Sequence, residues 1–237
     1  MRLRSFLIVV SAVVFLYGCG NNDNIIQEHY RNDIILFDTY RVEFDIRLEN
    51  IGYSDKTARL IKSLVYQDKD FDEYITFTEN EFIGPVTSED FPPVTDEYEY
   101  EYLYQSFLNE SYNILHHNKN FVVIEYNNYY YYSGAAHGMF WTKFYNIDIK
   151  DGKILEIDDL LNPIPDDFLV SLINEQYNIK FFLREEIWPP DTVYINRDNI
   201  ELIWNVYTIT PYSDGIICLI IQDDTYLTKK GKSLKKR

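Results

Sequence analysis

Residues 144–157 read FYNIDIKDGKILEI, and this stretch decides the fold class. Two apolar-rich runs, 144–149 and 154–157, flank the tetrapeptide Lys150-Asp151-Gly152-Lys153. An Asp-Gly pair between such runs is typical of a tight hairpin turn, because Gly adopts the left-handed backbone that the turn requires. Strands joined by so short a connection run antiparallel. The stretch therefore predicts a β-hairpin within a mainly antiparallel sheet.

Further strands and a few helices are predicted on both sides of this hairpin. Apolar and charged residues alternate over 38–48, which is typical of a half-buried strand. Helices are expected at 54–65 and, after an opening at Asp158 or Asp159, from about Pro165. The other predicted strands are 97–102, 111–115, 121–132, 193–195, 200–206 and 216–222. Strands with few interposed helices predict an α+β fold, with a mainly antiparallel sheet and a few packed helices.

The N-terminus resembles a bacterial lipoprotein signal. Arg2 and Arg4 precede the apolar run 6–17, which is shorter than the roughly 20 residues that a spanning helix needs. Leu16-Tyr17-Gly18-Cys19 is similar to the lipobox, although its second residue is bulkier than usual. The resemblance implies cleavage before Cys19 and addition of a diacylglyceryl group to its thiol. The alternatives are an uncleaved anchor and a plain secreted protein.

Lipidation of Cys19 predicts a protein anchored in the cell envelope, because acyl chains on one cysteine hold it durably in a membrane. Gly20 rather than Asp follows this cysteine, which favours the outer over the inner membrane if the source is Gram-negative. The periplasmic and the surface side both stay open. We expect a monomer whose membrane contact is the lipidated Cys19.

Composition changes along the chain predict its organisation. Residues 84–96 carry three prolines among scattered acidic residues, which is typical of a loop or a domain boundary. The expected segments are a signal peptide at 1–18, a polar tether at 19–32, a small α+β region at 33–96, a strand-rich domain at 97–226 and a solvated basic tail at 227–237.

The charge of the chain excludes one class of partner. The formal balance is −16, from 22 basic and 38 acidic residues. Arg2, Arg4 and the six basic residues of 229–237 leave 14 basic residues against all 38 acidic ones in between, a balance of −24. Such a body repels phosphate backbones. We therefore predict no nucleic-acid partner.

No residue pattern points to catalysis or to a metal. The four histidines form no pair at i and i+4, and the two cysteines, Cys19 and Cys218, form no cluster, so no zinc-site spacing is present. Cys218 lies in the apolar run 216–221, where a cysteine acts as a small hydrophobic side chain. Once Cys19 is lipidated, Cys218 has no disulfide partner. We predict no catalytic residue, metal site or cofactor.

Three blocks of the second half resemble the domain-of-unknown-function 3298 family (DUF3298). Residues 129–138, YYYYSGAAHG, are similar to its Tyr-x-Gly-Gly-Ala-His signature, with Ala135 where the second Gly is usual. Residues 146–161 resemble the next block, and 200–215, with Pro-Tyr and a Gly turn, resemble the closing one. The resemblance covers about 97–223. Residues 38–65 are a looser match to the domain of unknown function 4163.

The resemblance implies an extracytoplasmic α+β module that binds or senses a ligand. The same module occurs in the lysozyme-sensing anti-sigma-V factor and beside peptidoglycan deacetylase domains. Lysozyme is the ligand of that sensor, and the resemblance alone does not assign it to this chain. No separate deacetylase domain is recognisable in the sequence.

His137 is the strongest single candidate for a binding role. Small residues surround it, including Gly134 and Gly138, so another chain can approach the backbone there. The alternative is structural, in which these residues form a tight strand connection that a hydrogen bond of His137 fixes. Together with the resemblance, these features predict Tyr132, Gly134, His137 and Tyr212 as binding residues.

Tyrosine is abundant, with 22 residues, and four are consecutive at 129–132. Alternation along a strand places two of these four on each face. Exposed aromatic patches mark partner or glycan surfaces, whereas the alternative is cross-strand packing within the sheet. An acidic rim around exposed aromatic side chains favours a cationic protein partner.

These observations predict a lipid-anchored binding or sensory module of the cell envelope that is not an enzyme. Its ligand is unknown, and a cationic protein such as lysozyme fits the charge. The alternative function is an envelope enzyme that acts on peptidoglycan or another glycan through a carboxyl pair. A glycan is also the alternative ligand for a binding module.

Overall fold

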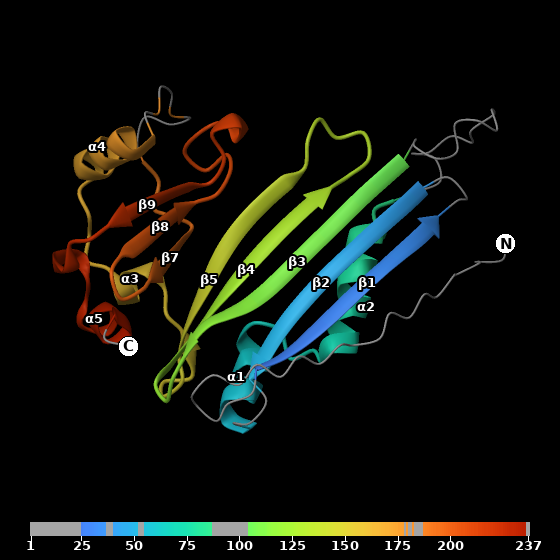
Figure 1. The fold of residues 1–237 in the computed structure, drawn as a ribbon, viewed down its shortest axis with the longest axis horizontal. Coiled ribbons are helices and arrows are strands. Elements are labelled where there is room, and N and C mark those ends of the chain that lie inside the picture. Colours follow the sequence, from blue (N-terminus) through green and yellow to red (C-terminus); the bar gives the residue numbers. More distant parts are fainter. Residues whose placement is uncertain are drawn as a thin grey trace. The chain divides into compact units, whose positions relative to one another are not determined.

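The computed structural model describes residues 25–36, 40–51, 55–86, 104–177, 179, 182 and 187–235 (Figure 1). These residues form two sheets and several helices, so the predicted α+β class is confirmed. The strands are β1 (Ile25–Leu36), β2 (Tyr40–Ile51), β3 (Tyr104–His117), β4 (Phe121–Tyr131), β5 (Met139–Asp148), β6 (Lys153–Ile154), β7 (Thr192–Ile195), β8 (Ile200–Trp204) and β9 (Ile217–Ile221). The α-helices are α1 (Asp55–Leu64), α2 (Phe71–Ile83), α3 (Ile157–Leu160), α4 (Asp166–Tyr177) and α5 (Lys229–Lys235).

The strands follow the chain order in both sheets. The larger sheet has the order β1-β2-β3-β4-β5-β6 and the smaller one β7-β8-β9. Antiparallel pairing joins β1 to β2, β5 to β6, and β7 to β8 to β9, so most of the pairing is antiparallel, as predicted for the sheet. The pair β2–β3 is parallel. Parallel neighbours need a long connection, and the chain between these two strands passes through α1 and α2.

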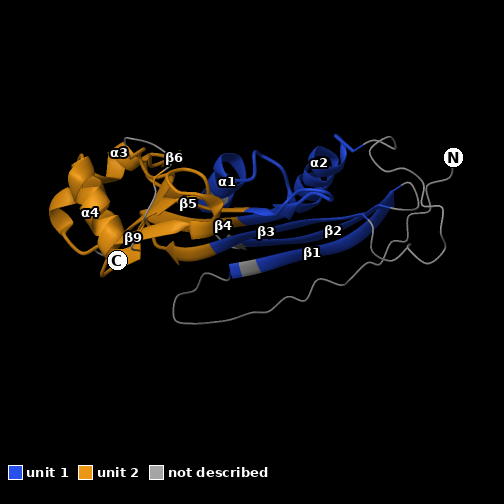
Figure 2. Cartoon of the chain, turned by 90° about the horizontal axis from the view of Figure 1, so that it is seen from above, with its two compact units in different colours: residues 1–113, 128–139 blue, residues 114–127, 140–237 orange. Residues whose placement is uncertain are grey.

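The chain divides into two compact units (Figure 2). Unit 1 contains residues 1–113 and 128–139, and unit 2 contains residues 114–127 and 140–237. The predicted division between residues 96 and 97 differs from this arrangement, because the units are not consecutive stretches of chain. Strands β3 and β4 each contribute residues to both units, and a boundary inside a strand leaves no loop composition to detect.

Unit 1 is built on the alternation predicted for 38–48. The even-numbered residues of β2 from Tyr40 to Leu48 are buried to 2% exposure or less. Helices α1 and α2 lie on one face of the strands of this unit (Figure 2), and Phe82 of α2 meets Phe44 edge-to-face at 5.7 Å between ring centroids. Asp70 and Glu73 begin α2 with a reciprocal capping box, which satisfies two backbone N–H groups at its first turn.

The core of unit 2 lies between the ends of β4 and β5, the small sheet and helices α3 to α5. The backbone N–H of Phe144 donates to Thr192 Oγ1 at 2.8 Å, and Asn146 Nδ2 donates to the carbonyl of Val193 at 2.8 Å. The Tyr177 hydroxyl at the end of α4 donates to the carbonyl of Cys218 on β9 at 2.7 Å. Because β9 is an edge strand of the small sheet, this bond satisfies a carbonyl that no neighbouring strand can reach.

The hairpin that decided the fold class is confirmed. Ile147 pairs with Ile154 and Asp148 with Lys153, and Gly152 has a φ of 68°, the left-handed conformation expected for this position. The helix predicted from about Pro165 and the three C-terminal strands are also present, each within two residues of the expected bounds.

The predicted tether is wrong from Ile25 onward, because 25–36 form strand β1. This strand pairs with β2 along its whole length, from Ile25 opposite Ile51 to Leu36 opposite Tyr40. It is the edge strand of its sheet, and its half-buried face includes the polar residues Glu28 and Asn32. An edge strand of this kind lacks apolar alternation, so its composition resembles that of a tether.

The predicted solvated basic tail is also wrong, because Lys229–Lys235 form helix α5. Leu234 is fully buried, and Gly231 lies against the backbone carbonyl of Leu160 in α3. A side chain at position 231 would collide with that carbonyl. One leucine and one glycine carry this packing, too few apolar positions for a sequence pattern to reveal.

Several predictions fall outside the described residues. These are the signal peptide at 1–18, Cys19, the first residue of the helix predicted at 54–65 and the strand predicted at 97–102. None of the helices that the structure describes is long and apolar enough to span a bilayer.

We expect Leu234→Ala to lower the free energy of unfolding by about 2–4 kcal/mol, because it opens a cavity in the core of unit 2. Urea unfolding of the full chain measures this change. Lys232→Ala is the matched control on the exposed face of the same helix. Equal unfolding midpoints for the two variants would contradict the packing of α5.

Candidate binding site

Three of the predicted binding residues lie in the connection between β4 and β5. Ser133 N donates to Ser106 Oγ at 2.9 Å, and Ala135 N donates to the carbonyl of Tyr132 at 3.0 Å. Gly134 is exposed and has a φ of 85°, so a side chain there would be strained. His137 Nδ1 lies 2.9 Å from the carbonyl oxygen of Gly138, to which it must donate. This connection is a tight turn with His137 half-buried in it.

The consecutive tyrosines divide between the two faces as the alternation requires. Tyr132 stacks on Phe82 of α2 at 4.6 Å and contacts Tyr130, so this face packs against the helices of unit 1. Tyr129 covers Gly138, where a Cβ atom would collide with its ring. Tyr129 and Tyr132 nevertheless keep 41% and 38% of their surface exposed. Both hypotheses for the consecutive tyrosines therefore hold in part: their rings pack within unit 1, and two of them also stay partly exposed.

Tyr212, the fourth predicted binding residue, lies in unit 2 within an aromatic cluster. Its ring contacts Phe140 edge-to-face at 5.5 Å and Tyr207 at 5.7 Å between centroids. We call Phe140, Tyr207 and Tyr212 the aromatic cluster. Tyr207 is 43% exposed. The sequence predicts Tyr212 as a binding residue but gives no signal for its neighbour Tyr207.

Tyr207 adopts a backbone conformation that L-residues with large side chains rarely adopt, with a φ of 66°. Asp191 holds the turn around it. Its Oδ2 accepts from the backbone N–H of Asn205 at 2.6 Å and from Thr208 Oγ1 at 2.7 Å. Asn205 Oδ1 in turn accepts from the backbone N–H of Thr142 in β5. The surroundings therefore maintain an unfavourable conformation that presents an aromatic ring to solvent.

A small pocket of about 200 Å³ is lined in part by Trp188, Pro189 and Pro190, which directly precede Asp191 in the chain. Aliphatic side chains from α3, α4, β8 and Ile187 form its walls, together with Pro163, Pro189 and Pro190. Trp188 forms part of the lining and is 48% exposed. The fully buried Trp204 donates its indole N–H to the carbonyl of Trp188 at 2.7 Å, which fixes the backbone of this segment. We call this cavity the Trp188 pocket.

Two carboxylates, Asp158 and Asp166, also line the Trp188 pocket. Both residues are exposed, and neither has a hydrogen-bond or ion-pair partner among the residues that the structure describes. No sequence motif predicts this site, because its residues come from three separate segments. The only available signal was Trp188-Pro189-Pro190, an aromatic residue next to rigid backbone.

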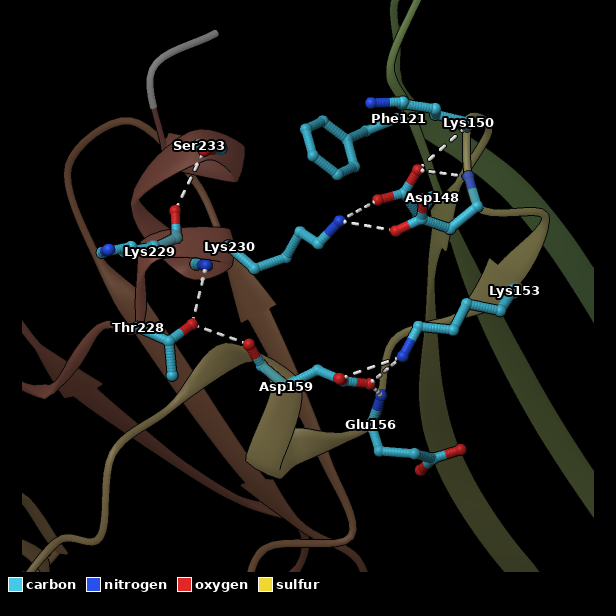
Figure 3. Close-up of polar contacts among 12 residues, drawn as sticks. Phe121, Asp148, Lys150, Lys153, Glu156, Asp159, Thr228, Lys229, Lys230 and Ser233 are labelled. Atoms are coloured by element: carbon cyan, nitrogen blue, oxygen red, sulfur yellow. Dashed lines mark hydrogen bonds and ion pairs between the residues drawn. The ribbon is translucent and has the colours of Figure 1, made fainter.

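The C-terminal segment holds the α3 side of the pocket in place (Figure 3). Thr228 Oγ1 donates to the carbonyl of Asp159 at 2.6 Å and accepts from the backbone N–H of Gly231 at 3.1 Å. The backbone N–H of Thr228 donates to the carbonyl of Leu160 at 3.0 Å. Helix α5 is therefore bonded to α3, whose residues Ile157 and Asp158 line the pocket.

Lys230 ties α5 to the β5–β6 turn (Figure 3). Its ammonium group forms ion pairs with Asp148, whose side chain is only 4% exposed, and with Asp151 at 3.0 Å. The other oxygen of Asp148 accepts from the backbone N–H groups of Lys150 and Asp151 at 2.9 and 3.0 Å. Both oxygens of this buried carboxylate accept hydrogen bonds from the turn and from α5, which indicates a structural role.

These contacts shift the pKa values of both partners. Burial alone would raise the pKa of Asp148, but the hydrogen bond from Lys230 and those from the turn outweigh burial and lower it below the usual 3.8. The hydrogen bonds to Asp148 and Asp151 raise the pKa of Lys230 above 10.5. Asp148 therefore contributes stability above its unfolded pKa and loses it as the pH falls through its folded pKa.

Cys218 has none of the features of a reactive thiol. It is half-buried on β9, and its Sγ lies 3.9 Å from Glu201 Oε2. Burial, reinforced by the Glu201 carboxylate, raises the pKa of Cys218 to about 11, so the thiol stays protonated at neutral pH. Within the described part of the chain, no three His, Cys, Asp or Glu side chains come together as metal ligands.

Comparison with known proteins identifies a family model that matches one segment of the chain. Residues 158–224 match the sequence model of a family described as "Protein of unknown function (DUF3298)". Residues 158–224 are a DUF3298 domain. This domain contains α4, β7, β8 and β9, the turn at Tyr207, the 3₁₀-helix that begins at Tyr212, and most of the Trp188 pocket. The block at 129–138 and residues 146–157 of the block at 146–161 lie outside the matched range, and the likeness to the domain of unknown function 4163 stays a prediction.

Two solved structures of DUF3298 family members share the fold. One, from Bacteroides fragilis NCTC 9343, has a TM-score of 0.65 and 19% identity, and the match covers 92% of this chain and 100% of that one. The other, from Pseudomonas aeruginosa PAO1, has a TM-score of 0.51 and 15% identity, over 87% of this chain and 95% of that one. No curated protein matches the chain.

We expect Lys230→Met to lower the free energy of unfolding at neutral pH by about 2 kcal/mol, because it leaves Asp148 buried without its counter-ion. The difference from the natural protein should shrink as the pH falls through the folded pKa of Asp148, where protonation removes the charge in both proteins. Urea unfolding at a series of pH values measures both effects. Lys229→Met, at the exposed neighbouring position, is the control. A difference that is independent of pH would show that the ion pair is not its cause.

Proposed function

We propose that this protein is a lipid-anchored binding module of the cell envelope whose ligand is a cationic protein, with lysozyme as a candidate. Lipidation at Cys19 anchors the chain in the membrane, and the DUF3298 domain carries the binding surface. The sequence supports the anchor through the lipobox at 16–19, and the net charge of −16 supports a basic partner.

The conformation of Tyr207 is the single observation that carries this proposal. A left-handed backbone at Tyr207 lowers the stability of the fold. Because the ring is partly exposed to solvent, its burial offsets little of that loss. Strain that the surrounding structure maintains is a feature of functional sites. Exposed tyrosine and tryptophan side chains are also the residues that anchor protein interfaces. The aromatic cluster therefore fits a contact surface better than a folding requirement.

The charges around the aromatic cluster support a cationic partner. Asp191 supports the Tyr207 turn, and Asp214 lies two residues beyond Tyr212 in the same short 3₁₀-helix. Both aspartates are exposed. Acidic groups that surround aromatic anchors attract basic proteins and repel acidic ones.

Binding without catalysis is the function that we infer. A glycosidase needs a carboxylic acid held in an apolar site, where burial keeps it protonated near neutral pH. The two carboxylates of the Trp188 pocket, Asp158 and Asp166, are instead exposed. This geometry favours attraction of a cation over the protonation of a leaving group.

We expect Tyr207→Gly to separate stability from binding. Glycine adopts a φ of 66° without strain, so the free energy of unfolding should rise by up to about 1 kcal/mol. Loss of the ring should weaken binding to a basic protein by about tenfold or more. Urea unfolding measures the first effect, and titration of full-length protein with lysozyme and with cytochrome c, at low and high salt, measures the second.

Asp68→Gly is the matched control, because Asp68 is also left-handed, with a φ of 63°, but belongs to unit 1. It should leave binding unchanged. An unaltered affinity in Tyr207→Gly would remove the aromatic cluster from the interface. Binding that is absent, or equally strong at both salt concentrations, would contradict a cationic protein partner.

A further inference from the structure

We propose that the Trp188 pocket receives one lysine or arginine side chain of the bound protein. The inference deepens the proposed function and rests on it, because it assumes a basic protein partner. The pocket is a second contact site, separate from the aromatic cluster, and it binds a single side chain of the partner. Three properties of the pocket lead to this inference: its size, its apolar walls and the charges at its lining.

The size of the pocket favours one side chain over a drug-sized ligand. Its volume is about 200 Å³. Pockets for drug-sized ligands usually enclose about 300–1,000 Å³. A cavity below that range has room for one long side chain but not for a drug-sized ligand.

The walls of the pocket select an apolar stem. Aliphatic residues such as Leu161, Leu169 and Leu202 line it together with three prolines, and Asn162 is the one uncharged side chain in its lining that has both hydrogen-bond donors and acceptors. A sugar ring brings several hydroxyl groups at once, and a buried hydroxyl without a hydrogen bond is costly. The amide of Asn162 already donates to the carbonyl groups of Thr225 and Leu227, so the lining offers a sugar few partners besides the two aspartates. The methylene groups of lysine and arginine require none and pack readily on apolar surfaces.

The charges of the pocket select a cation at the end of that stem. Asp158 and Asp166 line the cavity and have no polar partner in the described residues. Trp188 is half-exposed in the same lining, and the face of an indole ring attracts ammonium and guanidinium groups. In a side chain with an apolar stem and a cationic end, the stem can therefore contact the aliphatic walls, and the cation can contact the carboxylates and the indole ring.

The backbone around the pocket is already in place for such a contact. Pro189 and Pro190 restrict the chain, and the bond from Trp204 fixes the carbonyl of Trp188. Asp191 follows directly and holds the Tyr207 turn. One short segment therefore supports both the pocket and the aromatic cluster, so a single partner can contact both.

The test uses n-butylammonium, which has the four-carbon stem and the ammonium group of a lysine side chain. n-Butanol is the neutral ligand of equal length. Each is titrated into ¹⁵N-labelled full-length protein while the indole N–H resonances of the three tryptophans are recorded. Trp188 should shift saturably, Trp204 should follow through its bond to Trp188, and Trp141, which is not in the lining, should not respond.

We expect n-butylammonium to bind about tenfold more tightly than n-butanol, since two partly solvated carboxylates contribute. The double variant Asp158→Asn with Asp166→Asn should remove this preference and leave the affinity for n-butanol unchanged. Asp167→Asn is the matched control, because Asp167 is exposed beside Asp166 but does not line the pocket. Unchanged indole resonances in the unliganded double variant would show that the fold is intact.

Equal affinity for the two ligands, no saturable shift of Trp188, or a preference that survives in the double variant would overturn the inference. These outcomes are distinguishable from failure of the proposed function. If basic proteins bind the full chain but n-butylammonium does not, the pocket inference alone fails. If n-butylammonium binds selectively but no basic protein binds, the pocket does accept a cation with an apolar stem, and the proposed protein partner is wrong.

Discussion

The ion pair between Lys230 and the buried Asp148 is the contact on which the organisation of unit 2 depends. It attaches a short C-terminal helix to the turn of the central hairpin. The same helix places Gly231 against α3, and Thr228 bonds to the carbonyl groups of Asp159 and Leu160. Because α3 lines the Trp188 pocket, a charge pair at the end of the chain positions a surface formed by residues some 70 positions earlier.

The segment 187–191 connects the structural and the proposed functional parts of the DUF3298 domain. Its tryptophan contributes the aromatic wall of the pocket, and its prolines limit backbone freedom. Its aspartate maintains the strained turn at Tyr207. Exposed aromatic rings held on rigid backbone lose little conformational entropy on binding, which is how preorganised surfaces gain affinity. The same segment thus supports the strained turn at Tyr207 and accepts a hydrogen bond from the fully buried Trp204.

Local chemistry made much of the fold predictable from the sequence. The Asp-Gly turn at 151–152 and the alternation along β2 each specify their element within a few residues, and both appear as expected. Strand β1 and helix α5 were missed because pairing and a charged contact stabilise them, with little apolar periodicity. In the candidate site, Tyr212 is predictable because it belongs to a sequence motif. Tyr207 and the Trp188 pocket are not, since a left-handed backbone and a cavity built from three segments leave no pattern in the sequence.

The central claim is that the aromatic cluster and the Trp188 pocket form one contact surface for a basic protein. Backbone hydrogen exchange of the full chain, with and without saturating lysozyme, tests it most directly, because it reports protection along the whole chain in one experiment. We predict slower exchange in the segment after Pro190 and in 205–215, with little change in β1 and β2. Protection confined to β1 and β2, or to the 133–138 connection, would contradict the account and place the interface on unit 1.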